Sequence, residues 1–275
     1  MSATLAIPIP ALAARKRRLA RVLKGASGVL LLLAAWQLSV PLVGLSSYFY
    51  PSPADVVVAF GDLIAKGILP VYFADSMGRY AAGLSIGAAS GIVLGVAIGL
   101  NRRVSLALSP MLKFLFAIVE VAWVPIFVVW FGYGFKTIIL ALVYVVFFPV
   151  LYNTLLGVRT APQILVNAVR SLGGSRWDAL KLVILPAALP GIITGLRVAA
   201  GFAFRGLVFA EMVAAKTGIG YLIFEGTQSQ QTARTIVGMI MMGLTWLAID
   251  LCYLRPIERA TIERWGLTTD AAERK

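Results

Sequence analysis

The sequence predicts an all-α membrane protein with six transmembrane helices. Hydrophobic residues make up 60% of the 275 residues and charged residues only 13%, which is too few to cover the surface of a soluble protein. The apolar residues are gathered into runs of about 20 residues, the length of helix that crosses a bilayer core. The formal net charge of +13 comes from basic residues that lie mainly between these runs, as is typical of multi-pass membrane proteins.

Missing residue types exclude several classes of enzyme. The sequence has no His and a single Cys, Cys252, so it cannot form a Ser-His-Asp triad, a Cys-His pair, a His-bearing zinc site or an intrachain disulfide. The segment GYGFKT at 132–137 lacks the spacing of a phosphate-binding P-loop. We therefore expect no catalytic site, no metal site and no cofactor bound by this chain.

Six apolar runs are long enough to cross a membrane, and the first has an alternative interpretation. A cluster of six basic residues between Arg15 and Lys24 precedes it, an order also found in cleaved signal peptides. We favour a retained helix, because the run is long for a signal peptide and no clear cleavage site follows. The predicted spans are 26–43, 80–100, 112–131, 137–158, 191–213 and 235–254.

The distribution of basic residues predicts the orientation. With both termini in the cytoplasm, 18 of the 25 Lys and Arg residues lie on the cytoplasmic side, 5 lie outside and 2 lie within the fifth span. This bias follows the positive-inside rule. It also accounts for the net charge without a nucleic acid partner, which we do not expect.

A short amphipathic helix is predicted on the outer side, after the first span. Ser52 is a typical N-cap, Pro53 fits the first turn and Asp55 suits its positive end, whereas Gly67 favours termination. The charged residues of this segment argue against the alternative of a re-entrant loop. The expected apolar face comprises Val57, Phe60 and Ile64.

Glycine recurs at every fourth position of the second span. Small residues at this spacing allow another helix to approach closely within a membrane. We expect the partner to be a helix of the same chain, and a seam between two chains is the alternative. The stripe comprises Gly83, Gly87, Gly91, Gly95 and Gly99.

The loop between the fourth and fifth spans, 159–190, is predicted to form two helices joined by a turn. Pro162 opens the first helix, and Gly173 and Gly174 break it. Ser175, with Asp178 three residues later, forms a capping box that begins the second helix. The prolines at 186 and 190 are expected to end the second helix and to lead into the fifth span.

Trp177, beside Arg176, gives this loop two alternative roles. Trp and Arg are enriched at the energetic centres of protein interfaces, so the hairpin is suited to dock a partner protein. The alternative is a tryptophan ring at the level of the lipid headgroups. The residues alone leave both open.

Charges within the predicted spans are expected to face a partner or a cavity. Glu120 and Arg205 both lie near mid-depth, so we expect either that they pair or that Arg205 faces a cavity and screens an anionic substrate. A different partner for Arg205 is the third alternative. Arg197 is expected to extend toward the cytoplasmic surface, and Glu211 and Asp250, near span ends, are expected to be structural.

The same loop resembles the EAA motif of ATP-binding-cassette (ABC) importer permeases, which reads E-A-A, three residues, Gly, nine residues and I-x-L-P. The corresponding residues here are Asn167-Ala168-Val169, Gly173 and Val183-x-Leu185-Pro186. Asn167 replaces the Glu, so contacts that need its carboxylate are not expected. The resemblance implies that the loop couples to an ATPase through Asn167, Ala168, Gly173, Gly174, Ser175, Arg176, Trp177, Asp178, Leu185 and Pro186.

Other fragments resemble the nitrate/sulfonate/taurine branch of these permeases, over about residues 26–267. They follow the order and topology of that branch. The fragments are Pro51-Ser52-Pro53, Ala122-Trp123-Val124-Pro125, Trp130-Phe131-Gly132, Phe148-Pro149, Leu185-Pro186-Ala187-Ala188-Leu189-Pro190, Gly195-Leu196-Arg197, Ala210-Glu211-Met212 and Gly218-Ile219-Gly220-Tyr221-Leu222.

The resemblance implies a type I transmembrane domain that works as a dimer, expected to be a homodimer, with two cytosolic ATPases and an extracytoplasmic substrate-binding protein. ATP and Mg would be held by the ATPases, and the coupling helix, 175–182 here, would sit in an ATPase groove. The implied division is a cytosolic basic tail (1–25), a first helix with the outer amphipathic helix (26–70), a permease core (71–256) with its coupling loop (159–190), and a cytosolic C-terminal tail (257–275).

The expected function is therefore that of a permease subunit of an ABC importer in the bacterial inner membrane. Its solute is expected to be a small anion such as nitrate, a sulfonate, taurine or a carboxylate. The alternatives are an ABC permease for amino acids and, from another class, an ion channel or a secondary transporter. A channel needs no cytosolic helical lever, and a secondary transporter usually shows inverted repeats.

Overall fold

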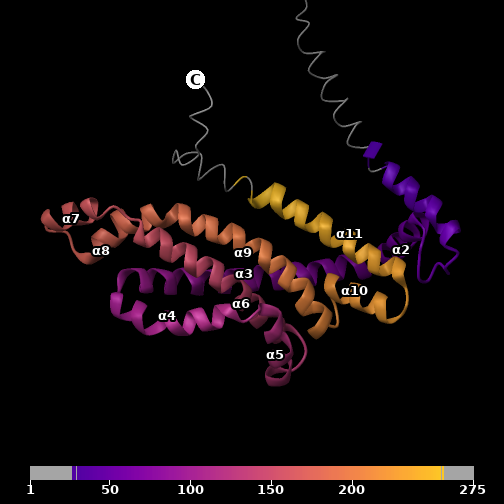
Figure 1. Ribbon diagram of the computed structural model, residues 1–275, viewed down its shortest axis with the longest axis horizontal. Helices are drawn as coiled ribbons and strands as arrows, with labels where there is room; N and C mark the ends of the chain where they lie inside the picture. The colour runs from indigo at the N-terminus through magenta and orange to yellow at the C-terminus, as the bar shows by residue number, and fades with distance from the viewer. Residues whose placement is uncertain (1–26, 29, 255, 257–275) are drawn as a thin grey trace, which may run out of the picture.

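The structure is a computed structural model that describes residues 27–28, 30–254 and 256. These residues form an elongated helical bundle, with helices running along its long axis (Figure 1). After a first helix, Leu30–Val43, the elements are α2 (Pro53–Ala65), α3 (Ile68–Leu100), α4 (Arg102–Ala117), η1 (Glu120–Ala122), α5 (Trp123–Phe131), α6 (Phe135–Arg159), α7 (Gln163–Ser171), α8 (Arg176–Ala179), η2 (Leu180–Ile184), α9 (Leu185–Ala214), α10 (Ile219–Gln228), α11 (Thr232–Ile249) and η3 (Asp250–Leu254).

Four helices in the described part are long and apolar enough to cross a membrane: Ile68–Leu100, Phe135–Arg159, Arg176–Ala214 and Thr232–Leu254. They contain the predicted second, fourth, fifth and sixth spans. The first helix, Leu30–Val43, is shorter, and the start of its predicted run lies outside the described residues. Helix α3 begins at Ile68, well before the predicted start at residue 80. It includes the charged residues Asp75 and Arg79, which form ion pairs with each other and, for Arg79, with Glu211.

The core forms where α3, α6 and α9 pack together along most of their length. The glycine stripe of α3 faces α6 of the same chain. A Cβ atom at Gly87 would lie 2.7 Å from Val146 Cβ, and one at Gly95 would lie 2.8 Å from Thr154 Cβ. The two backbones therefore approach more closely than larger side chains would allow. The stripe is an intrachain contact and leaves no room for a second chain.

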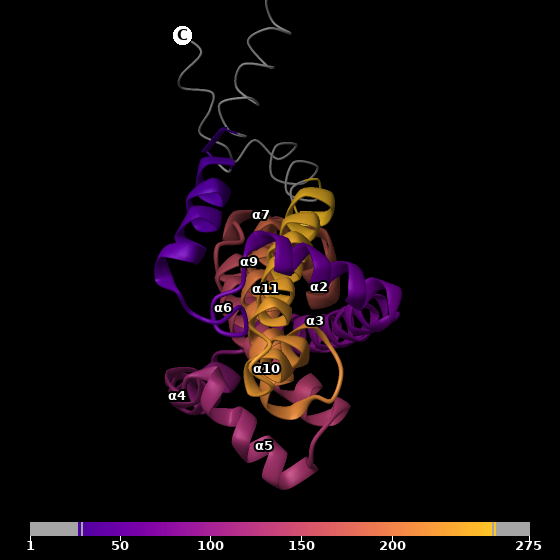
Figure 2. The same cartoon turned by 90° about the vertical axis from the view of Figure 1, so that its right-hand side faces the viewer.

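The predicted third span, 112–131, is not one continuous helix. Helix α4 and the segment Glu120–Phe131 meet at 83°, and α5 projects away from the bundle (Figures 1 and 2). Ile118 and Val119 have extended backbone at the bend. The Tyr144 hydroxyl donates hydrogen bonds to the Leu115 and Ile118 carbonyls there, which the broken helix leaves without their usual partners.

The sequence predicted that Pro186 and Pro190 end the second helix of the inner loop, and this prediction was wrong. Helices α8 and α9 form one helix over Arg176–Ala214, with Pro186 at the start of α9 and Pro190 inside it. The connecting segment η2 is a π-helix in which the Leu185 N–H donates to the Leu180 carbonyl. This wider turn accommodates a proline that a regular α-helix would not.

Helix α2 begins with the expected capping box, because the Asp55 N–H donates to Ser52 Oγ at 3.2 Å and the Ser52 N–H donates to Asp55 Oδ2 at 2.8 Å. It ends before Gly67, whose φ of 70° is left-handed. Of the expected apolar face, Phe60 packs with the buried residues Val56 and Leu63 against α3, α10 and α11. Val57 and Ile64 are 71% and 46% exposed.

Candidate functional site

A cavity of about 420 Å³ opens beside the bend between α4 and α5, where these segments meet α6 and α9. Aromatic and aliphatic side chains form most of its wall, and Glu120 and Asn153 add polar groups. Its lining residues are Phe116, Ala117, Ile118, Val119, Glu120, Tyr144, Val145, Phe148, Pro149, Tyr152, Asn153, Val198 and Phe202. A small organic molecule fits a cavity of this size.

Glu120 reaches the cavity because of the bend. It begins the 3₁₀ turn that follows the extended residues Ile118 and Val119, and Tyr144 holds this break against α6. In the described part of the chain, no hydrogen bond or ion pair reaches the Glu120 carboxylate. A carboxylate within an apolar segment, left without a protein partner, marks a candidate functional group.

Arg205 does not pair with Glu120, contrary to the first alternative from the sequence. Its side chain is exposed, and no described residue forms an ion pair with it. The expected pair assumed a straight third span, whereas the bend turns Glu120 toward the cavity. Arg205 follows Val198 and Phe202 at spacings of seven and three residues, so it lies on the cavity-lining side of α9.

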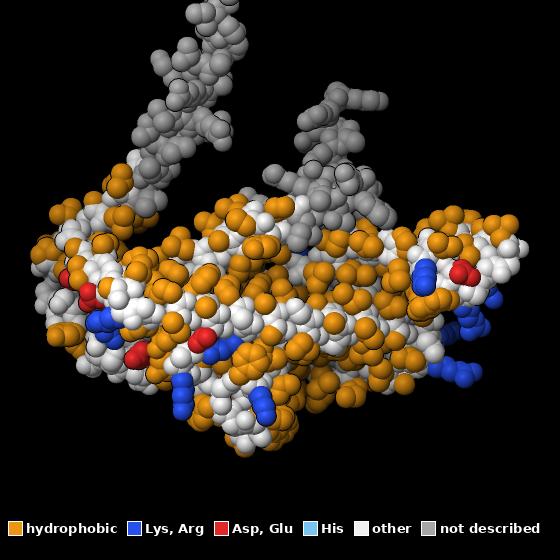
Figure 3. All heavy atoms as spheres, turned by 180° about the vertical axis from the view of Figure 1, so that it is seen from behind, with side chains coloured by type: hydrophobic (Ala, Val, Ile, Leu, Met, Phe, Trp, Pro, Cys, Tyr) orange, Lys and Arg blue, Asp and Glu red, His pale blue; other side chains and the backbone are white. Residues whose placement is uncertain are grey.

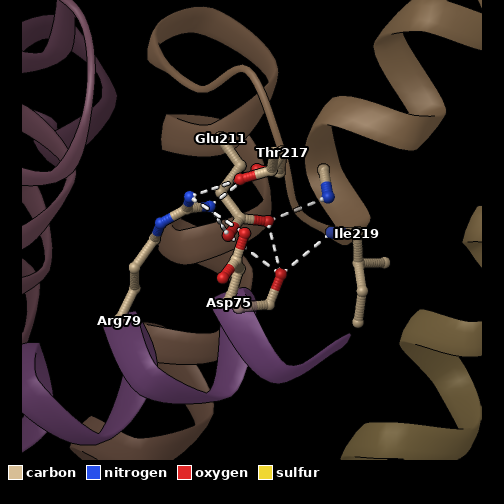
Figure 4. Close-up of polar contacts among 7 residues, drawn as sticks. Asp75, Arg79, Glu211, Thr217 and Ile219 are labelled. Atoms are coloured by element: carbon tan, nitrogen blue, oxygen red, sulfur yellow. Dashed lines mark hydrogen bonds and ion pairs between the residues drawn. The ribbon is translucent and has the colours of Figure 1, made fainter. Parts of the chain in front are cut away.

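Among the described residues, Glu211, near the end of α9, forms a buried ion pair (Figure 4). Arg79 Nη1 donates to Glu211 Oε1 at 2.7 Å, and the Ser76 hydroxyl donates to the same carboxylate at 2.9 Å. The Gly220 N–H adds a third donor at 3.0 Å. Because Glu211 is fully buried, these donors compensate for the removal of its charge from water.

The same network fixes the loop that joins α9 to α10. Arg79 also donates to the Thr217 carbonyl at 2.6 Å and to Thr217 Oγ1 at 2.8 Å, and the Ile219 N–H donates to Ser76 Oγ at 2.9 Å. Glu211 therefore has the structural role that the sequence predicted: with Arg79 and Ser76, it holds this loop in place. Arg79 precedes the predicted second span, 80–100, so the sequence did not identify it as the partner of Glu211, and it did not predict α10 either.

The hairpin formed by α7, α8 and the following η2 lies at the opposite end of the bundle (Figure 1), and it is called the coupling hairpin below after the coupling loop that its sequence resembles. Gly173, with a φ of 87°, makes the turn between its helices. The Asp178 N–H donates to Ser175 Oγ at 3.2 Å and the Ser175 N–H donates to Asp178 Oδ2 at 2.8 Å, which completes the expected capping box. The second helix therefore starts at a fixed position.

The coupling hairpin exposes large apolar side chains at its surface. Trp177 is 61% exposed, with Lys181 Nζ lying 5.1 Å from the centre of its ring. Leu172 is 89% exposed. Ile164 and Leu182 are also exposed. Several apolar residues gathered on one short polar hairpin are typical of a protein-binding surface.

Exposed basic residues gather at the same end of the bundle (Figure 3). One acidic residue of the hairpin, Asp178, is engaged in the capping box. The α10 end carries a mixture of acidic and basic residues. The basic residues of the hairpin end are Arg102, Arg103, Arg159, Arg170, Arg176 and Lys181.

The described residues provide no group of three or more His, Cys, Asp or Glu side chains that could hold a metal ion. The other residues predicted to couple to an ATPase lie on α7 and at the start of α9, and Pro186 lies within the continuous helix Arg176–Ala214 instead of ending a helix. Asn167 and Ala168 are exposed on α7, and Leu185 and Pro186 are half-buried at the start of α9.

Comparison with known proteins identifies the family. The family described as "Binding-protein-dependent transport system inner membrane component" matches residues 91–255. A Bacillus subtilis protein provisionally named as an aliphatic sulfonates transport permease is 34% identical over 84% of each chain. The taurine transport system permease protein of Escherichia coli is 32% identical over 83% of this chain and 84% of its own length.

The fold also matches a solved structure. A crystal structure of an amino acid ABC transporter covers 73% of this chain and 97% of its own, with a TM-score of 0.58 and 16% identity. At this identity the match concerns the fold alone, and it confirms the expected all-α type I importer architecture. From its sequence and its fold, this chain belongs to the binding-protein-dependent transport system inner membrane components, the multi-pass permease subunits of ABC importers.

Proposed function

We propose that this chain forms the translocation pathway for a small anionic solute in an ATP-driven importer and has no ATPase activity of its own. Relatives that match most of its length are named for the transport of aliphatic sulfonates and of taurine. Both names denote compounds with an anionic sulfonate group. The chain supplies a pathway and a lever, and ATP with Mg is bound by partner ATPases.

The observation that carries this proposal is the exposed apolar surface of the coupling hairpin. Trp177 and Leu172 lie outside the packed core, on a hairpin whose turn and cap are fixed by Gly173 and Ser175. A rigid hairpin of this kind can enter a groove of an ATPase and transmit its movement to α9, with which it is continuous. An ion channel or a secondary transporter has no need of such a lever.

The basic residues at the hairpin end support a cytoplasmic location for the hairpin and both termini. The α10 end then faces the extracytoplasmic binding protein. The proposed division keeps the boundaries expected from the sequence: 1–25, 26–70, 71–256 with the coupling loop 159–190, and 257–275. A second permease chain, in the simplest case a copy of this one, completes the pathway.

The position of Arg205 supports the proposal that the solute is an anion. It is exposed on the side of α9 that lines the cavity, and no described residue neutralises it. A cation in this position lowers the cost of moving a negative charge through a medium of low dielectric constant. Amino acids remain the second solute class to be tested.

The experiment is reconstitution of the permease with its ATPases and binding protein in liposomes, followed by measurement of ATP hydrolysis and uptake. The panel contains nitrate, aliphatic sulfonates, aminosulfonates, carboxylates and amino acids. We expect hydrolysis to be stimulated by at least one anion of the panel and by no cationic amino acid. Uptake that persists without ATP or without the ATPases would contradict the proposal.

A further inference from the structure

We propose that the cavity beside the bend binds the ammonium group of a zwitterionic organic solute, such as an aminosulfonate. This inference rests on the proposed function and narrows the solute class. The anionic end of the solute would face Arg205, and the cationic end would enter the cavity. Simple inorganic anions would then be poor substrates of this subunit.

The wall of the cavity has the chemistry of a cation site. Phe116, Tyr144, Phe148, Tyr152 and Phe202 all line it, and the ring centroids of the contacting pairs lie between 5.1 Å (Tyr144 to Phe148) and 6.4 Å (Phe148 to Tyr152) apart. The faces of aromatic rings attract ammonium groups, more strongly when water is excluded. Such a cluster stabilises an organic cation and offers nothing to a small hydrated anion.

Glu120 adds a negative charge to this wall. Its carboxylate has no hydrogen bond or ion pair with the described residues, and none of the described residues lining the cavity is Lys or Arg. A lone anion entering here would meet a like charge with nothing to balance it. An ammonium group would neutralise the carboxylate, which is costly to leave unpaired within the membrane.

Asn153 provides a further acceptor. Its side-chain Nδ2 donates to the Pro149 carbonyl at 2.8 Å, which orients the amide and leaves Oδ1 available to accept a hydrogen bond. An ammonium group has three donors and no acceptor, so it can use both this oxygen and the Glu120 carboxylate.

Arg205 explains why the ligand is a zwitterion and not a simple amine. It lies one turn beyond the cavity-lining Phe202 on the same side of α9. A negative group next to this guanidinium and a positive group next to Glu120 would match both charges. Phe202, which lines the cavity one turn before Arg205, would contact the methylene groups of the solute.

The test is equilibrium binding to the permease–ATPase complex in nanodiscs of phosphatidylglycerol, whose headgroup has no amine, without the binding protein. The probes are labelled 2-aminoethanesulfonate and ethanesulfonate, which differ by the amino group. We expect wild type to bind the amino compound at least about tenfold more tightly. Glu120→Gln should remove this preference, and Glu225→Gln, a carboxylate of α10 outside the cavity, should keep it.

Two results would overturn the inference while the proposed function stands: equal binding of the two sulfonates by wild type, or an unchanged preference in a monodisperse Glu120→Gln complex. Loss of binding when phosphatidylethanolamine is added would assign the cavity to lipid headgroups and would also overturn it. ATP-dependent uptake of ethanesulfonate or nitrate in liposomes reports on the proposed function separately. Absence of uptake for every anion would remove that function and the inference with it.

Discussion

At the scale of single residues, the buried ion pair between Arg79 and Glu211 is expected to contribute strongly to the stability of the bundle. The Glu211 side chain is fully buried and Arg79 is 11% exposed, so removal of one partner leaves the other charge uncompensated in a medium of low dielectric constant. Such a loss costs about 3–5 kcal/mol. We expect Arg79→Ala to lower markedly the temperature at which the purified permease loses its monodisperse state on heating.

The control is the double variant. Arg79→Ala combined with Glu211→Ala leaves no buried unpaired charge, because Asp75, which lies 3.9 Å from Arg79, is 40% exposed, so the double variant should recover part of the lost thermal stability. A double variant less stable than Arg79→Ala alone would show that Glu211 contributes mainly through Ser76 and Gly220, the other donors to its carboxylate.

Arg205→Ala should leave stability unchanged and lower transport, in contrast to Arg79→Ala. The exposed guanidinium has no ion-pair partner among the described residues, so we expect the folded yield to match wild type. Anion uptake should fall at least about tenfold if this cation lowers the free energy of moving the anion through the membrane by about 1.4 kcal/mol. Arg205→Lys, which keeps the charge, is the matched control. A low yield of Arg205→Ala with normal transport per folded molecule would refute a pathway role.

The sequence identified the intramembrane charges but not their partners. Hydropathy places Glu120, Arg205 and Glu211 within apolar runs, yet pairing depends on which helices are neighbours and how they are rotated. The bend after Ala117 separates Glu120 from Arg205, and the early start of α3 brings Arg79 beneath Glu211. Neither feature is visible in a local window of sequence.

At the scale of elements, the approach of α3 to α6 is set by glycine. Gly87→Leu should drive side-chain atoms into Val146, whose Cβ lies 2.7 Å from a Cβ at position 87, and overpacking costs about 1–3 kcal/mol. Gly78→Leu is the matched control on the same helix, since a Cβ there meets nothing within 4 Å. We expect heat stability to fall in the first variant alone. Because Leu favours helix more than Gly does, an equal fall in both variants could not come from helix propensity and would show that the close contact at position 87 does not decide the result.

Apolar periodicity predicted where helices occur better than where they bend. Span 137–158 agrees closely with α6, because a long run without charge has one stable form in a membrane. Span 112–131 breaks, and the signals were Glu120 and the nearby Pro125, which fits the first turn of α5 and requires no N–H there. The continuation through Pro186 depends on a π-turn, which no residue pattern specified.

At the scale of the whole molecule, the charge asymmetry predicts its orientation. In a Cys252→Ala background, a membrane-impermeant thiol reagent added outside should label Ser229→Cys, at the end of α10, and not Ser175→Cys, in the coupling hairpin. Permeabilised cells should show labelling at both positions. Labelling of position 175 from outside in intact cells would reverse the proposed topology.

The coupling hairpin is the element on which the whole account depends, and Trp177 tests it most directly. Loss of an aromatic anchor at an interface commonly costs about 2 kcal/mol or more, close to thirtyfold in affinity. We predict that Trp177→Ala permease purifies as a folded protein with little bound ATPase. Trp130→Ala, which removes a ring of similar exposure (64%) on α5, should keep its ATPase. Normal ATPase retention and normal substrate-stimulated hydrolysis in Trp177→Ala would contradict the docking role of the hairpin.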